Sequence, residues 1–183
     1  MTPFPFSFTK TLQAVATLLR REKGQSMSYM RALKLLYIAD RESLAETGRT
    51  ISGDKVIAMK QGPVLSRLLD LIKGKDILAP KWDEYIEKEG YRITLAADPG
   101  NGMLCRYDID KLEEVCARYR EQDEWELVDI THTFPEWKKN HPGESSRPIP
   151  LQDILEAVGR SDQAEAIERD AKAARSLARL FGN

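Results

Sequence analysis

SYMRALKLLYIADRESLAET, residues 28–47, is the stretch around which the rest of the chain is organised. Apolar side chains recur in it at helical spacing, and Leu35 and Ile38 widen the stripe until most of the circumference at residues 33–39 is apolar. A helix that is apolar nearly all round lies inside a domain and is covered on several sides. Gly48 follows, and glycine is the usual residue in the left-handed conformation just past a helix end. The pattern predicts the central core helix of the protein.

The composition is typical of a globular protein with a single core. The chain has 183 residues, of which 42% are hydrophobic and 31% charged, with a formal net charge of −1. This length suffices for one domain and an appendage. A near-neutral charge gives no support for a broad nucleic-acid-binding surface. No apolar stretch approaches the roughly 20 residues that span a bilayer, and residues 1–20 lack a secretory signal pattern. We therefore expect a cytoplasmic protein with neither nucleic acid nor a membrane as its partner.

The segments on either side of the central stretch favour more helix and a short strand. Residues 1–8 hold three phenylalanines and two prolines, and we expect them to run extended with rings tucked against the body. Thr9 is a candidate N-cap for a helix over residues 10–23. Residues 55–59 have the short, β-branched character of a strand. Gly62-Pro63 is expected to close that strand and to begin the next helix, because proline suits the first helical position.

The middle of the chain favours a β-ribbon followed by short helices. Residues 82–95 alternate in polarity with a tip at Glu89-Gly90, and we expect this ribbon to pair with the 55–60 strand or to pack on helices. Asp110 opens a capping-box pattern, which predicts a helix to about residue 121. Asp123 or Glu124 begins a shorter helix, and Pro135 suits another first helical turn.

The last part of the chain begins with a change in composition. Residues 140–150, NHPGESSRPIP, are rich in proline and serine and predict a loop or linker. A short helix over residues 151–158 and a longer one over residues 161–181 follow, the latter with a narrow, alanine-rich apolar stripe. The expected fold is therefore mainly α with a small β element (α+β), a compact helical domain around the central buried helix.

The candidates for chemistry are few. His141 lies in the proline-rich loop and is expected to be solvated, and His132 has an aromatic neighbourhood that favours a structural role over a catalytic one. Cys105 and Cys116 are too far apart for a CxxC site, and we expect reduced thiols in or near the core. The chain has no HExxH, GxGxxG or GxxxxGK[ST] motif. We therefore predict no catalytic residues, no metal and no cofactor.

Asp40 and Arg41 follow directly on the apolar run, so one or both are expected to be partly buried. A buried charge must be paired or hydrogen-bonded, because leaving it unpaired is costly. One interpretation is that Asp40 or Arg41 holds the loop at residues 49–54 through backbone groups. The other is that the two residues present a polar patch to a partner.

The stretch LLYIADRESLAETGRTISGDKVIAMKQGPVLSRLLDLI, with THTFPEW later in the chain, resembles the Panacea domain, the family of the SocA antitoxin and of proteins long described as phage-associated. The resemblance covers roughly residues 9–140, so we expect a Panacea domain there and, in residues 141–183, a linker and C-terminal helices packed on it. After Gly-Pro-Val the family usually has Pro-Ser, where this chain has Leu65-Ser66. The motif positions, which the resemblance implies to be structural or partner-facing, are Tyr37, Asp40, Arg41, Gly48, Gly53, Asp54, Lys60, Gly62, Pro63, His132, Glu136 and Trp137.

The resemblance implies a mainly helical, non-enzymatic antitoxin. It implies that the protein neutralises a toxin by direct protein–protein contact, as proteins of this family do with unrelated toxins. In SocA the toxin is delivered to a protease such as ClpXP. The expected partner is thus a toxin encoded nearby. Because the motif residues are typical of scaffold, we expect the toxin contacts to come from the Phe-rich start and from the segment after Asn140.

Two other classes of function remain as alternatives. A DNA-binding transcriptional regulator would need a basic recognition helix, and residues 63–73 offer only Arg67 and Lys73. A phage-related enzyme using His132 with Asp40 would need those two side chains within hydrogen-bond reach around a cleft.

Overall fold

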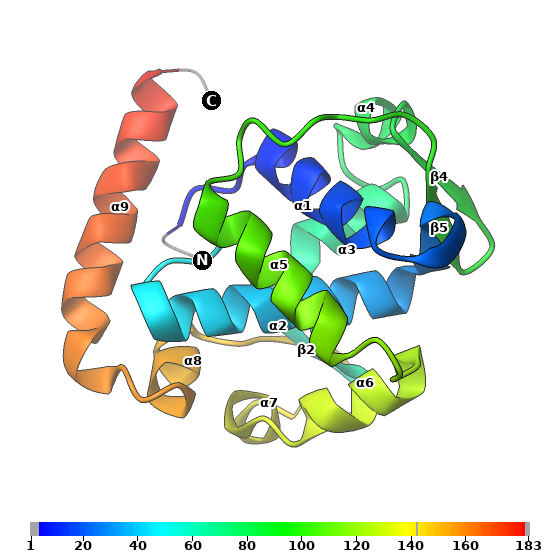
Figure 1. Ribbon diagram of the computed structural model, residues 1–183. Helices are drawn as coiled ribbons and strands as arrows, with labels where there is room; N and C mark the ends of the chain where they lie inside the picture. Colours follow the sequence, from blue (N-terminus) through cyan, green and yellow to red (C-terminus); the bar gives the residue numbers. More distant parts are fainter. Residues whose placement is uncertain (1–3, 142, 182–183) are drawn as a thin grey trace.

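The computed structural model describes residues 4–141 and 143–181 and shows a mainly helical α+β fold (Figure 1). The α-helices of this part are α1 (Phe8–Arg20), α2 (Tyr29–Thr47), α3 (Ser66–Ile72), α4 (Ala79–Asp83), α5 (Arg106–Arg118), α6 (Glu124–His132), α7 (Pro135–Lys139), α8 (Leu151–Ala157) and α9 (Ala164–Leu180). The strands are β1 (Ser26–Ser28), β2 (Val56–Met59), β3 (Gly62–Leu65), β4 (Ile86–Glu89), β5 (Arg92–Leu95) and β6 (Arg147–Pro148). Short 3-10 turns lie at Lys23–Gln25 and Ser161–Gln163.

Helix α2 is the central helix, as its apolar pattern predicts. Every residue from Arg31 to Asp40 is buried, because α1, α5, α6 and β3 pack around it (Figure 1). The Ser28 side chain caps its start by accepting a hydrogen bond from the Arg31 amide at 3.4 Å. Gly48 ends it in the left-handed conformation, with φ of 75°. The expected fold class and its buried central helix are confirmed.

Helix α1 begins and ends earlier than the sequence predicts. Ser7, not Thr9, is the N-cap, and its side chain accepts from the Lys10 amide at 3.3 Å. Ser7 holds this position because its extended backbone also donates to the carbonyl of Ser52 at 3.4 Å, a contact between distant segments. The helix ends at Arg20, and Gly24 lies in a separate 3-10 turn that leads into β1.

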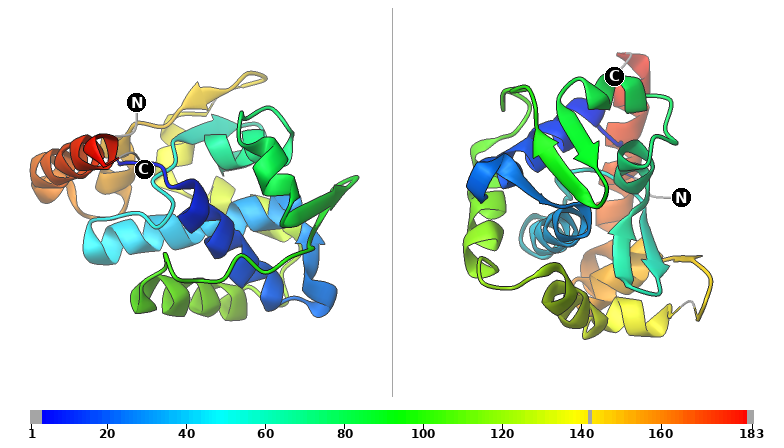
Figure 2. Two further views of the ribbon diagram at one scale, coloured as in Figure 1. Left: turned by 90° about the horizontal axis from the view of Figure 1, so that it is seen from above. Right: turned by 90° about the vertical axis from the view of Figure 1, so that its right-hand side faces the viewer.

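Two small antiparallel sheets flank the helices (Figure 2). The first has the order β1-β5-β4, so the predicted ribbon at residues 82–95 pairs with β1 and not with β2. The expectation of pairing with the 55–60 strand was therefore wrong, because the 3-10 turn after α1 lays a strand beside β5. Residues 82–83, with which the predicted ribbon begins, belong to helix α4 instead. The turn between β4 and β5 is at Gly90-Tyr91 and not at Glu89-Gly90.

The second sheet corrects the predicted role of Pro63. Its order is β3-β2-β6, and Pro63 lies in β3 opposite Ala58 instead of at the first position of a helix. Strand β3 is an edge strand, so the missing amide of proline costs no ladder hydrogen bond. Strand β6 arises within the predicted linker, where Arg147 and Pro148 pair with β2.

The short helices that follow agree in part with the predictions. Helix α5 begins at Arg106, and Asp110 lies inside it, because the Asp108 carboxylate accepts from the Cys105 amide at 3.0 Å and sets the start there. Cys105 is therefore exposed at a helix end and not near the core, whereas Cys116 is buried. The Asp123 cap of α6 and the Pro135 start of α7 are confirmed.

The C-terminal helices pack on the body through a small apolar cluster of their own. Ile154 and Leu155 of α8 and Ile167 of α9 join Leu44 and Trp137 in it. Figure 1 shows α9 along the left side of the molecule, near the end of α2. The division at residue 140 stays a prediction. In the described ranges no helix is long and apolar enough to cross a membrane.

The close packing of Gly53 against Pro5 allows a test of the fold. Gly53 has φ of +69°, and an added Cβ would lie 2.0 Å from the Pro5 carbonyl oxygen. We expect Gly53→Ala to lower the free energy of unfolding by about 2 kcal/mol or more and to detach the segment before α1, because backbone strain and a backbone clash act together. Chemical denaturation and limited proteolysis measure the two effects.

The matched control is Gly90→Ala. Gly90 also has a positive φ, of +59°, but no atom lies within 4 Å of an added Cβ. Gly90→Ala is expected to lower the free energy of unfolding only by the backbone strain, about 1 kcal/mol. Equal destabilisation by the two variants would contradict the packing of Gly53 against Pro5.

Candidate functional site

Glu136 is the centre of a buried polar cluster that joins α2 to α7. Its side chain is 0% exposed. The Tyr37 hydroxyl donates to Oε1 at 2.7 Å, and the Arg41 guanidinium donates to Oε1 at 2.6 Å and to Oε2 at 3.3 Å. The same guanidinium lies over the Phe134 ring, 4.3 Å from its centroid. Burial and then the Glu136 charge raise the pKa of Tyr37 well above its usual value, so the hydroxyl remains a donor.

Asp40 holds the loop that follows α2. Its Oδ1 accepts from the amides of Ile51 at 2.8 Å and Ser52 at 3.0 Å, and its Oδ2 accepts from the Ser52 hydroxyl. This is the first of the two roles considered for it. Burial raises the pKa of Asp40 to about 6, although the three hydrogen bonds oppose the rise. Both carboxylate oxygens are therefore used in contacts within the protein.

Asp54 caps helix α3 from a distant loop. Its two carboxylate oxygens accept from the amides of Arg67 at 3.0 Å and Leu68 at 2.8 Å, and Oδ1 also accepts from Lys55 at 2.7 Å. Burial raises the pKa of Asp54, while these hydrogen bonds oppose the change. Because the free amides at a helix start need acceptors, this cap explains why α3 begins at Ser66 and not at Pro63.

His132, Trp137 and His141 form an aromatic stack beside the cluster. The rings of His132 and Trp137 lie nearly parallel, 4.0 Å apart, and His141 meets Trp137 edge-on at 4.8 Å. The Trp137 indole donates to the Met59 carbonyl at 3.1 Å. Burial, followed by the nearby charge of Lys34, lowers the pKa of His132. His132 is thus a neutral ring packed on Trp137, and His141 is exposed as expected.

A cavity of about 380 Å³ adjoins Tyr37, Asp40 and Arg41. Residues of β2, α8 and α9 complete its walls, among them Val56 and Leu151. The polar side chains that α2 contributes to this wall already have partners inside the protein. The cavity therefore offers a mainly apolar surface. The charge of Arg41 is paired with Glu136, and Asp40 accepts hydrogen bonds from the loop after α2.

The structure brings some of the sequence-predicted residues together and separates others. Tyr37, Arg41 and Glu136 form one cluster, with His132 and Trp137 beside it. Asp40, Gly53 and Asp54 organise the loop after α2. Gly62 is close-packed, since an added Cβ would lie 2.7 Å from Thr131 Oγ1, and the carbonyl of its neighbour Pro63 accepts a hydrogen bond from Lys34. Gly48 lies apart at the end of α2, and Lys60 is exposed with its ammonium on Glu144.

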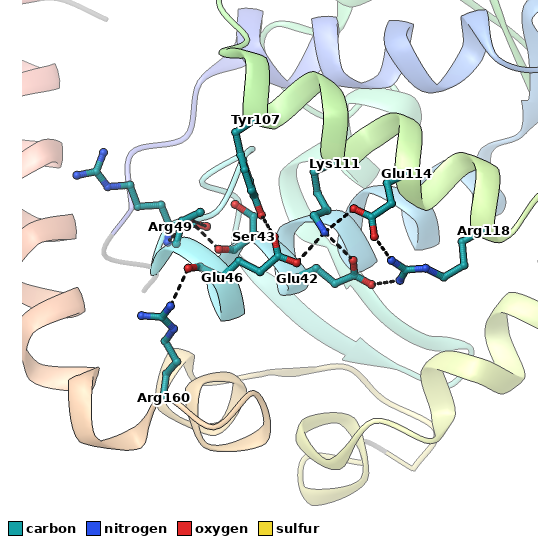
Figure 3. A network of polar contacts seen from close by, with 10 residues as sticks. Glu42, Ser43, Glu46, Arg49, Tyr107, Lys111, Glu114, Arg118 and Arg160 are labelled. Atoms are coloured by element: carbon teal, nitrogen blue, oxygen red, sulfur yellow. Dashed lines mark hydrogen bonds and ion pairs between the residues drawn. The ribbon is translucent and has the colours of Figure 1, made fainter.

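Sequence reasoning missed two buried lysines. Lys111 of α5 is 4% exposed and pairs with Glu42 at 3.2 Å, Glu46 at 2.7 Å and Glu114 at 2.9 Å (Figure 3). Burial works against its charge, but the hydrogen bonds that its ammonium donates to the three carboxylates outweigh burial and raise the pKa of Lys111. Glu42 and Glu46 come from α2, so no local pattern predicts these two contacts, whereas Glu114 lies one turn along on α5 itself. Lys34 had a signal, because it interrupts an otherwise apolar run.

The geometry of the fold and of this cluster defines a class of protein. It is a helical domain in which Tyr37, Arg41 and Glu136 bind one another, and in the part of the chain that the structure describes no group of three or more His, Cys, Asp or Glu could hold a metal ion. Residues 33–138 match the family described as Antitoxin SocA-like, Panacea domain. The match covers more than half of the chain, so this protein belongs to that family. No curated protein and no solved structure matches it significantly.

We expect Glu136→Gln to lower the free energy of unfolding by about 3 kcal/mol. The substitution removes the charge that Arg41 faces in a buried setting, and breaking one side of a buried pair is strongly destabilising. Urea denaturation at pH 7 measures the effect. Glu144→Gln is the matched control, because Glu144 and its partner Lys60 are 85% and 70% exposed, and such pairs contribute little. If both variants have wild-type stability, the Glu136 cluster does not join α2 to α7.

The raised pKa of Asp40 predicts that the stability of the protein depends on pH. The folded pKa of this residue, about 6, exceeds the ordinary 3.8, so the folded state binds the proton more tightly than the unfolded state does. This group's contribution to stability is therefore greatest below pH 4 and is lost as the pH rises through 6. We expect the stability of the wild type relative to Asp40→Asn to increase by up to about 3 kcal/mol from pH 7 to pH 4. A difference that is constant across this range would contradict the raised pKa.

Proposed function

We propose that this protein is an antitoxin that neutralises a toxin encoded beside it by direct protein–protein binding. The observation that carries the proposal is the family match over residues 33–138. The use of Asp40 and Glu136 in internal contacts adds support, because residues committed to the scaffold leave recognition to other surfaces.

Helix α9 is the surface that suits a partner best. Its first turns bury Ile167 and Ala171, but its last turns do not continue this packing. Leu177, Leu180 and Phe181 are 55%, 80% and 79% exposed. These three residues, which we call the α9 stripe, are spaced i, i+3 and i+4, the arrangement by which an amphipathic helix enters an apolar groove.

The charges around the α9 stripe indicate the chemistry of its partner. Residues 171–181 contain Lys172, Arg175 and Arg179 and no acidic residue. An apolar groove with an acidic rim would complement this helix end, since charge complementarity steers association and selects partners. We infer that the toxin surface bound by α9 has this character.

The Phe-rich start is less suited to this role than expected. Phe4 is 8% exposed and lies in the apolar cluster beneath α9. Phe6 and Phe8 pack against the main core, with Arg67 and Lys81 over their rings. Residues 1–3 lie outside the described part of the chain. We therefore place the proposed contact on the segment after Asn140, at α9.

The geometry favours neither alternative function. Helix α3 has seven residues, and its Arg67 pairs with Asp76 at 2.7 Å, so it offers little to a DNA groove. Asp40 binds the loop after α2 while His132 stacks on Trp137, and no described contact joins Asp40 to His132.

The test is a growth assay in which the neighbouring open reading frame is expressed alone and with this chain. We expect growth arrest that co-expression relieves, with the two proteins co-purifying. A double variant, Leu177→Ser with Leu180→Ser, is expected to fold normally, because both side chains are exposed, and to lose rescue. Ile77→Ser is the matched control, since Ile77 is 89% exposed elsewhere on the surface.

Each part of the proposal has its own contrary outcome. A harmless neighbour, or a toxic one that the wild type does not rescue, contradicts the antitoxin function. Full rescue by the double variant contradicts only the role of α9. Rescue that disappears in cells without ClpXP identifies delivery to that protease, and rescue that persists there identifies sequestration.

A further inference from the structure

An apolar groove lies between the start of α2, the β2–β3 turn and the end of α3, and we call it the α2–α3 groove. Its volume is about 280 Å³. Three buried side chains line it, those of Leu33, Val64 and Leu69. Met30 and Met59 also line it and are partly exposed. Methionine side chains are flexible and polarizable, and they are common at binding surfaces that adapt to their partners.

The apolar surface continues beyond the α2–α3 groove to Tyr91. Tyr29 lines the groove, and its ring stacks on that of Tyr91, with the two centroids 6.0 Å apart. Tyr91 is 78% exposed, so most of its side chain meets water. Aromatic residues and methionine are enriched at protein–protein interfaces relative to the rest of the surface. Two tyrosines and two methionines at one opening therefore indicate a contact surface for another protein.

The charged residues that line the groove are all basic. They are Lys34, Lys60 and Lys73, and no Asp or Glu lies among the described lining residues. Lys34 is buried with its ammonium on the Pro63 carbonyl, so its charge is not offered to a partner. Lys60 and Lys73 are exposed and form the rim of the groove. A basic rim around an apolar opening favours a partner of negative charge.

The protein itself places a carboxylate on this rim. Both oxygens of Glu144, in the segment between α7 and β6, lie 3.1 Å from the Lys60 ammonium. Both side chains of this pair are largely exposed, so the pair contributes little to stability and a partner's carboxylate replaces Glu144 at little cost. Lys73 forms no ion pair with any other residue of the part of the chain that the structure describes.

We propose that the α2–α3 groove binds an acidic segment of a partner protein, in which one or two large apolar side chains are flanked by Asp or Glu. The apolar side chains enter the groove beside Met30 and Met59, and the flanking carboxylates meet Lys60 and Lys73. The volume lies just below the roughly 300–1,000 Å³ of small-molecule sites, so it suits one or two side chains of a partner better than a complete ligand.

The α9 stripe of a second copy is a poor occupant of this groove. Residues 171–181 carry Lys172, Arg175 and Arg179 and no acidic residue, so they would meet the basic rim with like charge. The groove is also separate from the surface proposed for the toxin, because α8 and α9 pack near the end of α2 and the groove lies at its start. The proposal does not depend on the antitoxin function.

Fluorescence anisotropy of labelled peptides, with the full chain at up to millimolar concentration, tests the proposal. The probe is the peptide EDELFDEE. The references are KRKLFKRK, which keeps the apolar pair between basic flanks, and EDESSDEE, which keeps the acidic flanks without the apolar pair. We expect the probe to bind at least tenfold more tightly than either reference. Raising the salt from about 50 to about 500 mM is expected to weaken probe binding, because exposed charges are screened.

Met30→Glu tests the groove directly by adding a negative charge to its lining. Met30 is not among the described residues that pack against the main core, and it lies in the first turn of α2, where an acidic side chain is favourable. The variant is therefore expected to fold and to bind the probe at least tenfold more weakly. Met103→Glu is the matched control, because Met103 is 51% exposed elsewhere on the surface, and it should bind as the wild type does.

The rim is tested by the double variant Lys60→Gln with Lys73→Gln, which is expected to bind the probe at least fivefold more weakly. Lys138→Gln is the control, since Lys138 is exposed on α7 and does not line the groove. Glu144→Gln removes the carboxylate that competes for Lys60, so it is expected to raise the affinity about twofold. An unchanged or lower affinity of Glu144→Gln would contradict the contact between the probe and Lys60.

The proposal is overturned if the probe binds no more tightly than the references, or if it does not bind at millimolar concentration. It is also overturned if Met30→Glu or the lysine double variant binds the probe as the wild type does. Loss of binding in Leu177→Ser with Leu180→Ser, but not in Met30→Glu, would place the probe on the α9 stripe and overturn it as well. The first two outcomes need only the wild type, so they decide the matter even if a variant does not fold.

Discussion

The burial of α2 is the constraint on which the rest of the structure depends. Because neighbouring elements cover residues 31–40 of this helix, the charged side chains in this stretch, and Arg41 directly after it, are wholly or largely removed from water and need partners within the protein. Asp40 binds backbone and hydroxyl groups of the following loop, Arg41 binds Glu136, and Lys34 binds the carbonyl of Pro63. These partners lie on three different segments. The central helix therefore positions a loop, helix α7 and the β2–β3 hairpin through polar contacts as well as apolar packing.

The same contacts explain why the family motif is scattered along the sequence. Asp40 holds the loop, and Asp54 at the end of that loop caps α3. Gly53 between them lets the chain before α1 approach, because it has no Cβ to clash with Pro5. Trp137 reaches back to the carbonyl of Met59. Most of the motif residues therefore take part in contacts within the protein around α2, whereas Gly48 and Lys60 lie apart from them.

The partner surface that we propose for the toxin lies outside these contacts, beyond the C-terminal end of α2. Near its end, α8 and α9 pack on Leu44, and α9 carries its apolar stripe beyond that contact.

The sequence by itself determined the helical class, the central helix, the caps at Gly48 and Asp123, and the helix start at Pro135, because these depend on periodicity and on neighbouring residues. The sequence also favoured Asp40 or Arg41 as the residue that holds the loop at residues 49–54, and Asp40 has this role. Only the tertiary structure decided that Pro63 lies in an edge strand and that the 82–95 ribbon pairs with β1. It also decided that Glu136 meets Arg41 and that Lys34 donates to the carbonyl of Pro63. These features join residues far apart in the chain, and a local pattern carries no information about which distant segment supplies the partner.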